Sequence, residues 1–175
     1  MIVFENTPYR EDKNLIQAYN SFMELLPEDG WALFRDADTL FLDPFYGEII
    51  NRAIKNNPDA GCFTCLTNRI GNKIQLYDAY AGDDIVKHRK IAEAIKNKNY
   101  NTYDTFKFDV NSGSTLSGML ILISRATWVK IGGFKKSKIT QHRGLNSSIL
   151  GVDNQLHNDL HRMGIKLKII KNLPH

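Results

Sequence analysis

The chain has 175 residues, of which 42% are hydrophobic and 24% are charged. This length suits one domain with its own core, and the composition is that of a folded globular protein, which excludes a disordered chain. We therefore expect a single domain over residues 1–175. The net charge of +4 comes from dispersed lysines without interleaved aromatic residues, so nucleic acid is not expected as a partner.

Two features of the sequence concern the cellular compartment. No apolar run approaches the roughly 20 residues needed to cross a bilayer. The first residues lack the basic stretch and the long apolar segment of a signal peptide. The sequence therefore predicts a cytoplasmic protein without a transmembrane segment.

The first third of the chain alternates between strand and helix patterns. Residues 1–5 predict a short apolar strand, and apolar residues at three-to-four spacing over 12–26 predict an amphipathic helix. Residues 31–35 are apolar until Arg35, as expected of a central strand covered on both faces. A second helix is predicted over residues 44–55.

The same alternation continues to the end of the chain. In order, we expect a strand at 60–67, a helix at 83–99, a polar loop or edge hairpin at 100–114, a strand at 115–124, a short helix at 125–131, a polar loop at 135–148, a helix at 152–163 and a strand at 165–170. Alternation of this kind predicts an α/β fold, in which helices cover both faces of a mostly parallel sheet.

Cys62 and Cys65 form a C-x-x-C pattern, which occurs in redox pairs and in halves of zinc sites. Here the pattern falls on a predicted strand, where residues three apart face opposite sides. The chain has only these two cysteines, so no second pair completes a zinc site. We therefore expect two separate, partly buried thiols.

Two carboxylates directly follow the predicted strand over residues 31–35. Asp36 and Asp38 come where open α/β sheets bind ligands, just beyond the carboxyl ends of the strands. Hard oxygen ligands suit Mg²⁺ or Mn²⁺, which share their coordination with water and substrate phosphate. The alternative is an Asx turn in which one aspartate pairs with Arg35. The spacing alone leaves both interpretations open.

Three segments occur in an order that resembles the family-2-like glycosyltransferases of the GT-A fold. They are the D-x-D at 36–38, "SGMLILISRATWVKIGGF" at 117–134 and "GVDNQLHNDLHRMGIKLKII" at 151–170. The front of the chain, with "TPYR", "KN" and "AYN" before the D-x-D strand, resembles a compact subgroup. The resemblance covers about residues 14–170 and implies a Rossmann-like sheet that is abbreviated at the N-terminus.

By this resemblance, the chain would be a hexosyltransferase that uses Mn²⁺ or Mg²⁺. The donor would be a nucleotide-diphosphate sugar, and the acceptor a hydroxyl of a carbohydrate or of a lipid-linked saccharide. A lipid-linked acceptor would also imply peripheral membrane association. Two rivals stay open, namely a catalytically silent binding relative of the same fold and a nucleotidyltransferase. The latter would be expected to carry a glycine-rich phosphate loop, and residues 6–12 contain no glycine.

The resemblance also implies roles for individual residues. Asp38 would bind the metal, and Asp36 would bind the metal or the nucleotide ribose. Asp153 would be the general base of an inverting enzyme, followed by Asn154 where many relatives have a second acid. The alternative for Asp153 is the N-cap of the predicted helix. "GVDN" also resembles the "GGEN" of retaining enzymes, so the stereochemical outcome stays open.

Further substrate contacts and a third metal ligand follow from the same resemblance. The candidate substrate contacts are Thr7, Pro8, Arg10, Asn14, Arg35, Ser117, Gly118, Trp128 and Asn154. Gly118 is suited to close backbone approach or to packing, and Trp128 either lines the acceptor or packs in the core. His175 follows the last strand, where relatives place a histidine ligand, and His142 is the alternative.

His157 and His161 lie four residues apart on a predicted helix. That spacing would allow both to bind one metal, but no H-E-x-x-H glutamate accompanies them. We therefore expect surface or half-buried histidines at both positions.

Overall fold

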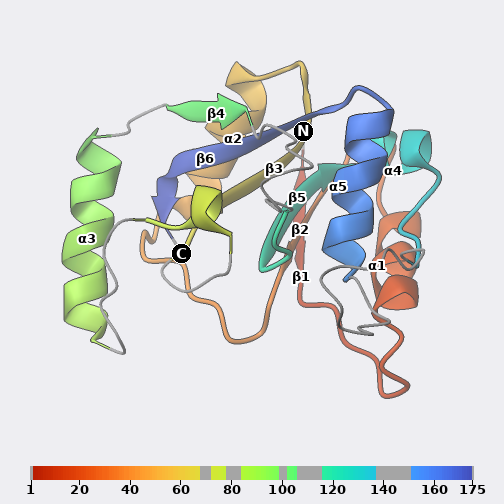
Figure 1. Ribbon diagram of the computed structural model, residues 1–175, viewed down its shortest axis with the longest axis horizontal. Helices are drawn as coiled ribbons and strands as arrows, with labels where there is room; N and C mark the ends of the chain where they lie inside the picture. The colour runs from red at the N-terminus through yellow and green to blue at the C-terminus, as the bar shows by residue number, and fades with distance from the viewer. Residues whose placement is uncertain are drawn as a thin grey trace, which may run out of the picture.

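The computed structural model describes residues 2–67, 72–77, 84–98, 102–105, 116–136 and 151–174. Within these ranges, six strands form one open sheet with helices around it (Figure 1). The strands are β1 (Val3–Asn6), β2 (Trp31–Arg35), β3 (Ala60–Leu66), β4 (Tyr103–Thr105), β5 (Leu120–Ser124) and β6 (Lys166–Pro174). The helices are α1 (Leu15–Glu24), α2 (Tyr46–Asn56), α3 (Ile85–Lys98), α4 (Arg125–Ile131) and α5 (Val152–Arg162), with a 3₁₀ turn η1 (Lys73–Gln75).

The sheet is mixed, with the strand order β1-β2-β5-β3-β6-β4. β1 and β2 pair in parallel, as do β3 and β6. Between these two pairs, β5 runs antiparallel to both of its neighbours, and β4 is antiparallel to β6 at one edge. The α/β class is therefore confirmed, and the sheet is mixed: β1, β2, β3 and β6 run in one direction, whereas β5 and β4 run in the other. A short apolar strand covered on both faces has the same pattern in either direction, so its sequence did not reveal the reversal of β5.

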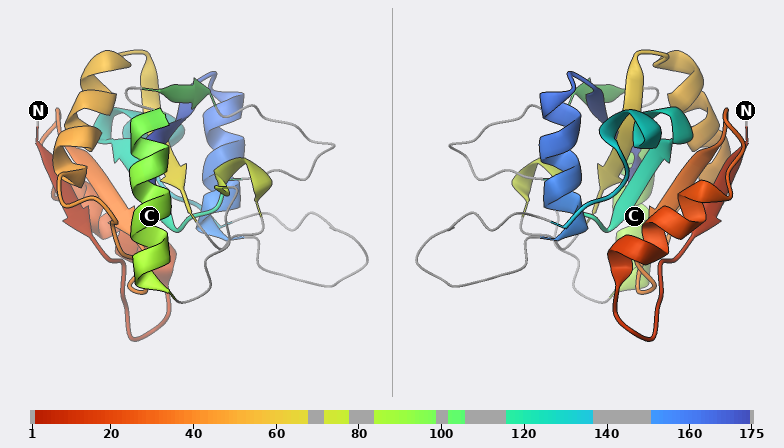
Figure 2. Two further views of the ribbon diagram at one scale, coloured as in Figure 1. Left: turned by 90° about the vertical axis from the view of Figure 1, so that its left-hand side faces the viewer. Right: turned by 90° about the vertical axis from the view of Figure 1, so that its right-hand side faces the viewer.

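Two apolar clusters cover the two faces of the sheet. On β2, Ala32 and Phe34 belong to the cluster shared with α1, α4 and α5, whereas Trp31 and Leu33 belong to the cluster shared with α2. Neighbouring residues of a strand point to opposite faces, and both faces of this strand are apolar because both are covered. Figure 2 shows α2 and α5 on opposite sides of the sheet, and α3 packs against β6. The prediction of helices on both faces is confirmed.

The two cysteines behave as expected from their strand spacing. Both are free thiols that are fully rather than partly buried, Cys62 in the cluster of α1, α4 and α5 and Cys65 in the cluster of α2. Burial raises the pKa of both thiols, because a thiolate is poorly solvated in an apolar core. Most other predicted elements agree with the structure to within a few residues, and β4 is indeed an edge strand, but the strand predicted over 115–124 begins only at Leu120 and the last strand continues to Pro174. Most of the loop predicted at 135–148 lies outside the described residues.

No helix among the described residues is long and apolar enough to cross a bilayer.

Gly61 allows β3 to pack closely against α4. A Cβ atom at this position would lie 2.3 Å from Thr127 Oγ1 and 2.5 Å from Ile165 Cγ2. Gly47 is the opposite case, because a Cβ atom there, in the first turn of α2, would meet nothing within 4 Å. The packing therefore requires a glycine at position 61 but leaves room for a larger residue at position 47.

We predict that Gly61→Ala lowers the free energy of unfolding by about 1–3 kcal/mol, because the added methyl group forces α4 or the start of β6 away from β3. Gly47→Ala is the matched control and should raise it by up to about 1 kcal/mol, since alanine is the better helix former. Urea unfolding followed by circular dichroism measures both. Equal midpoints for the two variants would contradict the packing described for β3.

Candidate functional site

The reversed direction of β5 brings its first residues to the carboxyl edge of the sheet. Because β2 and β3 run opposite to β5, the segment Leu116–Met119 enters the sheet where these two strands end. The N–H of Asp36 donates to the carbonyl of Met119 over 3.0 Å, which joins the end of β2 to this segment. Figure 1 shows the loop after β2 and the loop before α1 at the same, lower edge of the molecule.

Asp36, Asp38 and Asp153 share an electrostatic environment at this edge. The pKa of Asp36 is raised, first by its partial desolvation and then by the negative charges of Asp38 and Asp153. The pKa of the Tyr19 hydroxyl is also raised, mainly by burial and then by the negative charges of Asp36 and Asp153. Within the described part of the chain, none of the three carboxylates forms an ion pair with a basic side chain. Their repulsion is therefore not compensated by the protein residues described.

The carboxylate of Asp153 is held by two backbone N–H groups. Oδ2 accepts the N–H of Gly118 and Oδ1 accepts the N–H of Asn154, each over 2.9 Å. Two glycines make room for it, because a Cβ atom at Gly118 would lie 3.0 Å from Asp153 Cβ and one at Gly151 would lie 2.2 Å from Oδ1. The N-cap of α5 is Gly151, so the alternative of Asp153 as the N-cap is wrong. Asp153 instead lies in the first turn, where the helix dipole favours a negative charge.

Arg35 supports the loop after β2 rather than an aspartate of that loop. Its guanidinium pairs with Glu5 on β1 and donates to the carbonyl of Thr39 over 3.1 Å. Thr39 Oγ1 in turn donates to the carbonyl of Asp36 over 2.5 Å. The alternative in which Arg35 pairs with an aspartate of an Asx turn is therefore wrong. Contact of Arg35 with substrate stays a prediction.

The candidates near the N-terminus lie on the loop between β1 and α1. Arg10 pairs with Asp12 at 2.9 Å, and this contact lowers the pKa of Asp12 to about 2. Asn14 is the N-cap of α1, because its Oδ1 accepts the N–H of Gln17 over 3.2 Å. Thr7 is exposed and Pro8 is half-buried.

No hydrogen bond or ion pair among the described residues joins this loop to the three carboxylates. The loop nevertheless leaves the same edge of the sheet as Asp36, because β1 runs parallel to β2, and contact of its residues with a nucleotide stays a prediction.

Trp128 on α4 links to α1 on the face of the sheet that α1, α4 and α5 cover. Its Nε1–H donates to Asn20 Oδ1 over 2.9 Å, and the same oxygen accepts the N–H of Phe134 over 2.8 Å. The indole packs against the cluster of α1, α4 and α5. The core-packing alternative for Trp128 is therefore observed, and an acceptor contact stays a prediction.

Sequence reasoning missed two residues that hold the segment before β5. Gln75 stands between Ile74 and Leu76 in the sequence, and no motif or periodicity marks it as a residue of the site. His157 was expected at or near the surface, but it is only 2% exposed. Its Nδ1 accepts the N–H of Leu116 over 2.9 Å. Helix periodicity alone does not show how deeply one residue of an amphipathic helix is buried.

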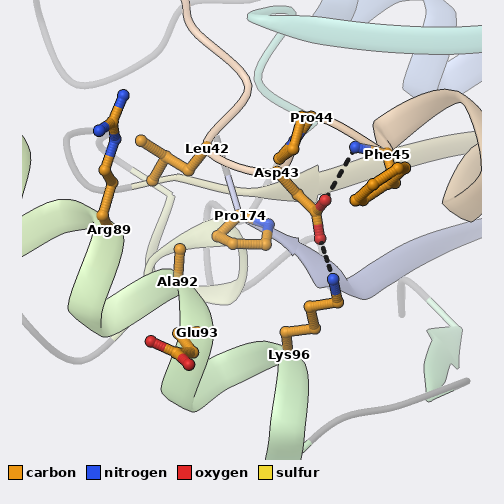
Figure 3. A pocket seen from close by; sticks show the side chains of 9 residues that line it. All are labelled: Leu42, Asp43, Pro44, Phe45, Arg89, Ala92, Glu93, Lys96 and Pro174. Carbon is orange, nitrogen blue, oxygen red and sulfur yellow. Dashed lines mark hydrogen bonds and ion pairs between the residues drawn. The ribbon is translucent and has the colours of Figure 1, made fainter.

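A hollow between α3 and the segment before α2 lies apart from these carboxylates and differs in its electrostatics (Figure 3). Burial by itself would raise the pKa of Asp43 there, but Lys96 at 2.6 Å and the N–H of Phe45 at 2.8 Å lower it below its usual value. The charge of Asp43 is thus already compensated. Of the two places, the carboxyl edge is the one whose carboxylates pair with no basic side chain among the described residues.

The donor set at the carboxyl edge fits a divalent cation. Asp36 and Asp38 offer hard carboxylate oxygens without a basic partner, and Mg²⁺ and Mn²⁺ bind through one or two such groups together with water and phosphate. Within the described residues, no group of three or more His, Cys, Asp or Glu side chains is arranged to hold a metal ion by itself. His175 and His142, the predicted third ligand and its alternative, lie outside those residues.

Comparison of the chain with protein-family models, curated proteins and solved structures finds no match. The resemblance to GT-A glycosyltransferases therefore stays a hypothesis.

We predict that Asp36→Asn makes the metal-free protein more stable. The folded state raises the pKa of Asp36, so its ionised form destabilises the fold at pH 7, and this destabilisation is relieved as the pH falls. Solvent screening limits the gain to about a few tenths of a kcal/mol. Thermal unfolding in EDTA measures it, and Asp29→Asn, at the opposite end of β2, is the control. A midpoint for Asp36→Asn at or below that of the control would contradict the predicted repulsion.

A second prediction concerns the pH dependence of stability. Burial, and to a lesser extent His161, lowers the pKa of His157 from 6.5 to about 4. The unfolded chain therefore binds a proton at a higher pH than the folded one, so stability present above pH 6.5 should be lost as the pH falls to about 4. The expected loss is about 3 kcal/mol.

His157→Asn keeps a hydrogen-bond acceptor near the position of Nδ1 but cannot be protonated, so it should remove most of this pH dependence. The exposed His161→Asn should leave it in place. Urea unfolding at pH 4, 5.5 and 7 measures the difference. Parallel pH profiles for wild type and His157→Asn would show that His157 does not carry the effect.

Proposed function

We propose that the chain is a glycosyltransferase of the GT-A fold that depends on Mn²⁺ or Mg²⁺. It would transfer a sugar from a nucleotide-diphosphate sugar to a hydroxyl of a carbohydrate or lipid-linked acceptor. The observation that carries the proposal is that Asp36 and Asp153 at the carboxyl edge are hydrogen-bonded to neighbouring residues, Met119 and Gly118, with Asp38 close enough to raise the pKa of Asp36, and that the described residues give none of the three a basic partner. This is also the edge at which open α/β sheets bind their ligands.

The two aspartates of the D-x-D serve the donor side in this proposal. Asp36 and Asp38 would hold the cation, which when bound supplies a Lewis acid for the leaving diphosphate. The protein prepares this site by fixing the loop, through the pairing of Arg35 with Glu5 and its hydrogen bond to Thr39. A loop held in this way needs little reorganisation when the donor binds, and pre-organised groups contribute most to catalysis.

Asp153 serves the acceptor side. Each of its carboxylate oxygens accepts one backbone N–H, which leaves further lone pairs free to receive a proton. Asp153 would remove the proton of the acceptor hydroxyl as the oxygen bonds to the anomeric carbon. The bond from that carbon to the diphosphate oxygen breaks at the same time, and its electron pair leaves with the diphosphate. This sequence of events is that of an inverting transfer.

We predict that the wild type binds UDP or GDP in calorimetric titrations only when Mn²⁺ is present. Asp38→Asn should weaken this binding at least tenfold, because it removes a charged oxygen ligand from the cation. Asp29→Asn keeps the same chemistry at the far end of β2 and should bind as the wild type does. Absence of nucleotide binding by folded wild-type protein would overturn the proposed function.

An activity assay on the same protein distinguishes an enzyme from a catalytically silent binding relative. Incubation with a panel of UDP- and GDP-sugars should release free nucleoside diphosphate, with water or added saccharide as acceptor. Asp153→Asn should bind nucleotide as the wild type does but release diphosphate at least tenfold more slowly. Nucleotide binding by the wild type without any release from the panel would favour the binding relative.

A further inference from the structure

Three consecutive N–H groups in the segment before β5 each donate to a side chain from elsewhere in the fold. Leu116 donates to Nδ1 of His157 over 2.9 Å, Ser117 to Oε1 of Gln75 over 2.8 Å, and Gly118 to Oδ2 of Asp153 over 2.9 Å. His157 and Asp153 lie four residues apart on α5, whereas Gln75 comes from η1. The segment is therefore held between α5 and η1.

The carboxamide of Gln75 is fully buried and hydrogen-bonded at both of its ends. Besides accepting the N–H of Ser117, it donates through Nε2 to the carbonyl of the same residue over 3.2 Å and to Thr64 Oγ1 over 2.8 Å. Oε1 also accepts Nδ2 of Asn72 over 3.2 Å. One side chain thus bonds both the N–H and the C=O of Ser117, as the backbone of a neighbouring strand would.

Gln75 is itself tied to the sheet. Its carbonyl accepts the N–H of Thr67 over 2.7 Å, directly beyond the end of β3, and Thr64 Oγ1 donates to the carbonyl of Leu120 in β5 over 2.9 Å. The carboxamide therefore joins β3, η1 and β5 in one buried network. In such surroundings an unsatisfied polar group is costly, so a fully bonded network favours one arrangement of the chain.

The position of Asp153 depends on this arrangement. Gly118 follows Ser117 directly, and its N–H is one of the two groups that hold the carboxylate of Asp153. A displacement of about 1 Å in a reacting group can slow an enzyme on the order of a hundredfold. A buried residue that fixes Ser117 therefore acts on the site without touching a substrate.

We propose that Gln75 is a positioning residue, which fixes the backbone of Ser117 and Gly118 and thereby places the carboxylate of Asp153. The consequence for turnover rests on the proposed function. The geometric consequence does not, because it concerns the hydrogen bond between Gly118 and Asp153 in the free protein.

The amide signal of Gly118 in ¹⁵N–¹H spectra tests the geometry directly. Asp153→Asn defines how this signal changes when its acceptor loses its charge. Gln75→Met, which keeps the length of the side chain and removes its hydrogen bonds, should also shift it and should speed hydrogen exchange at Ser117 and Gly118 at least tenfold. Thr64→Val removes only the hydroxyl that accepts a hydrogen bond from Gln75 Nε2, and it should change the Gly118 signal less.

Ile49→Val is the control for a general loss of stability. Ile49 is 1% exposed and lies on α2, in the cluster on the face of the sheet opposite α5, so the Gly118 signal should change much less than in Gln75→Met. A Gly118 signal that is the same in Gln75→Met and wild type would overturn the proposal. So would an equal change in Ile49→Val, because the effect would then follow stability alone.

Turnover supplies the second readout. Gln75→Met should release nucleoside diphosphate from a donor at least tenfold more slowly, with the Mn²⁺-dependent affinity for nucleotide within about threefold of wild type, because Asp36 and Asp38 are untouched. Unchanged release despite a shifted Gly118 signal would overturn the proposal. If the wild type binds no nucleotide, the proposed function fails, while a shifted Gly118 signal still supports the placement of Asp153 by Gln75.

Discussion

The reversal of β5 is the constraint on which the candidate site depends. A strand that runs antiparallel between β2 and β3 delivers its first residues to the edge where those two strands end. The segment Leu116–Met119 therefore meets groups from β2, η1 and α5, which are far apart in the sequence. If β5 ran parallel to its neighbours, these residues would lie at the opposite edge of the sheet. Gln75, His157 and Asp153 could then not accept their backbone N–H groups.

Charge compensation distinguishes the candidate site from the rest of the molecule. Asp59 lies between Lys166 at 2.6 Å and Lys168 at 3.1 Å, and the buried Asp159 pairs with Arg162 at 2.7 Å. Asp36 has the opposite environment, since the charged groups that act on it are carboxylates and they raise its pKa. Asp59 and Asp159 are paired with basic side chains, whereas the carboxylates at this edge repel one another, and uncompensated repulsion of this kind is typical of sites that bind a cation.

The buried polar network behind the site gives that edge its rigidity. Gln75 and His157 satisfy the backbone of a segment that is neither helix nor strand, and they do so from within the core. Loops that carry functional groups are precise when a rigid scaffold holds them. Here that scaffold includes the backbone of η1, which continues the hydrogen bonding of β3 beyond its end.

Hydrophobic periodicity by itself determined the elements, the two covered faces and the separation of Cys62 from Cys65, because these depend on spacing along the chain. It also indicated Asp36 and Asp38 as candidates, since both follow a buried strand directly. Tertiary structure decided the direction of β5, the partner of Arg35 and the burial of His157. It also decided the role of Gln75, which is joined to Ser117 across 42 positions of the chain. Contacts between distant residues depend on how strands are paired, and an apolar pattern is the same for either direction of pairing.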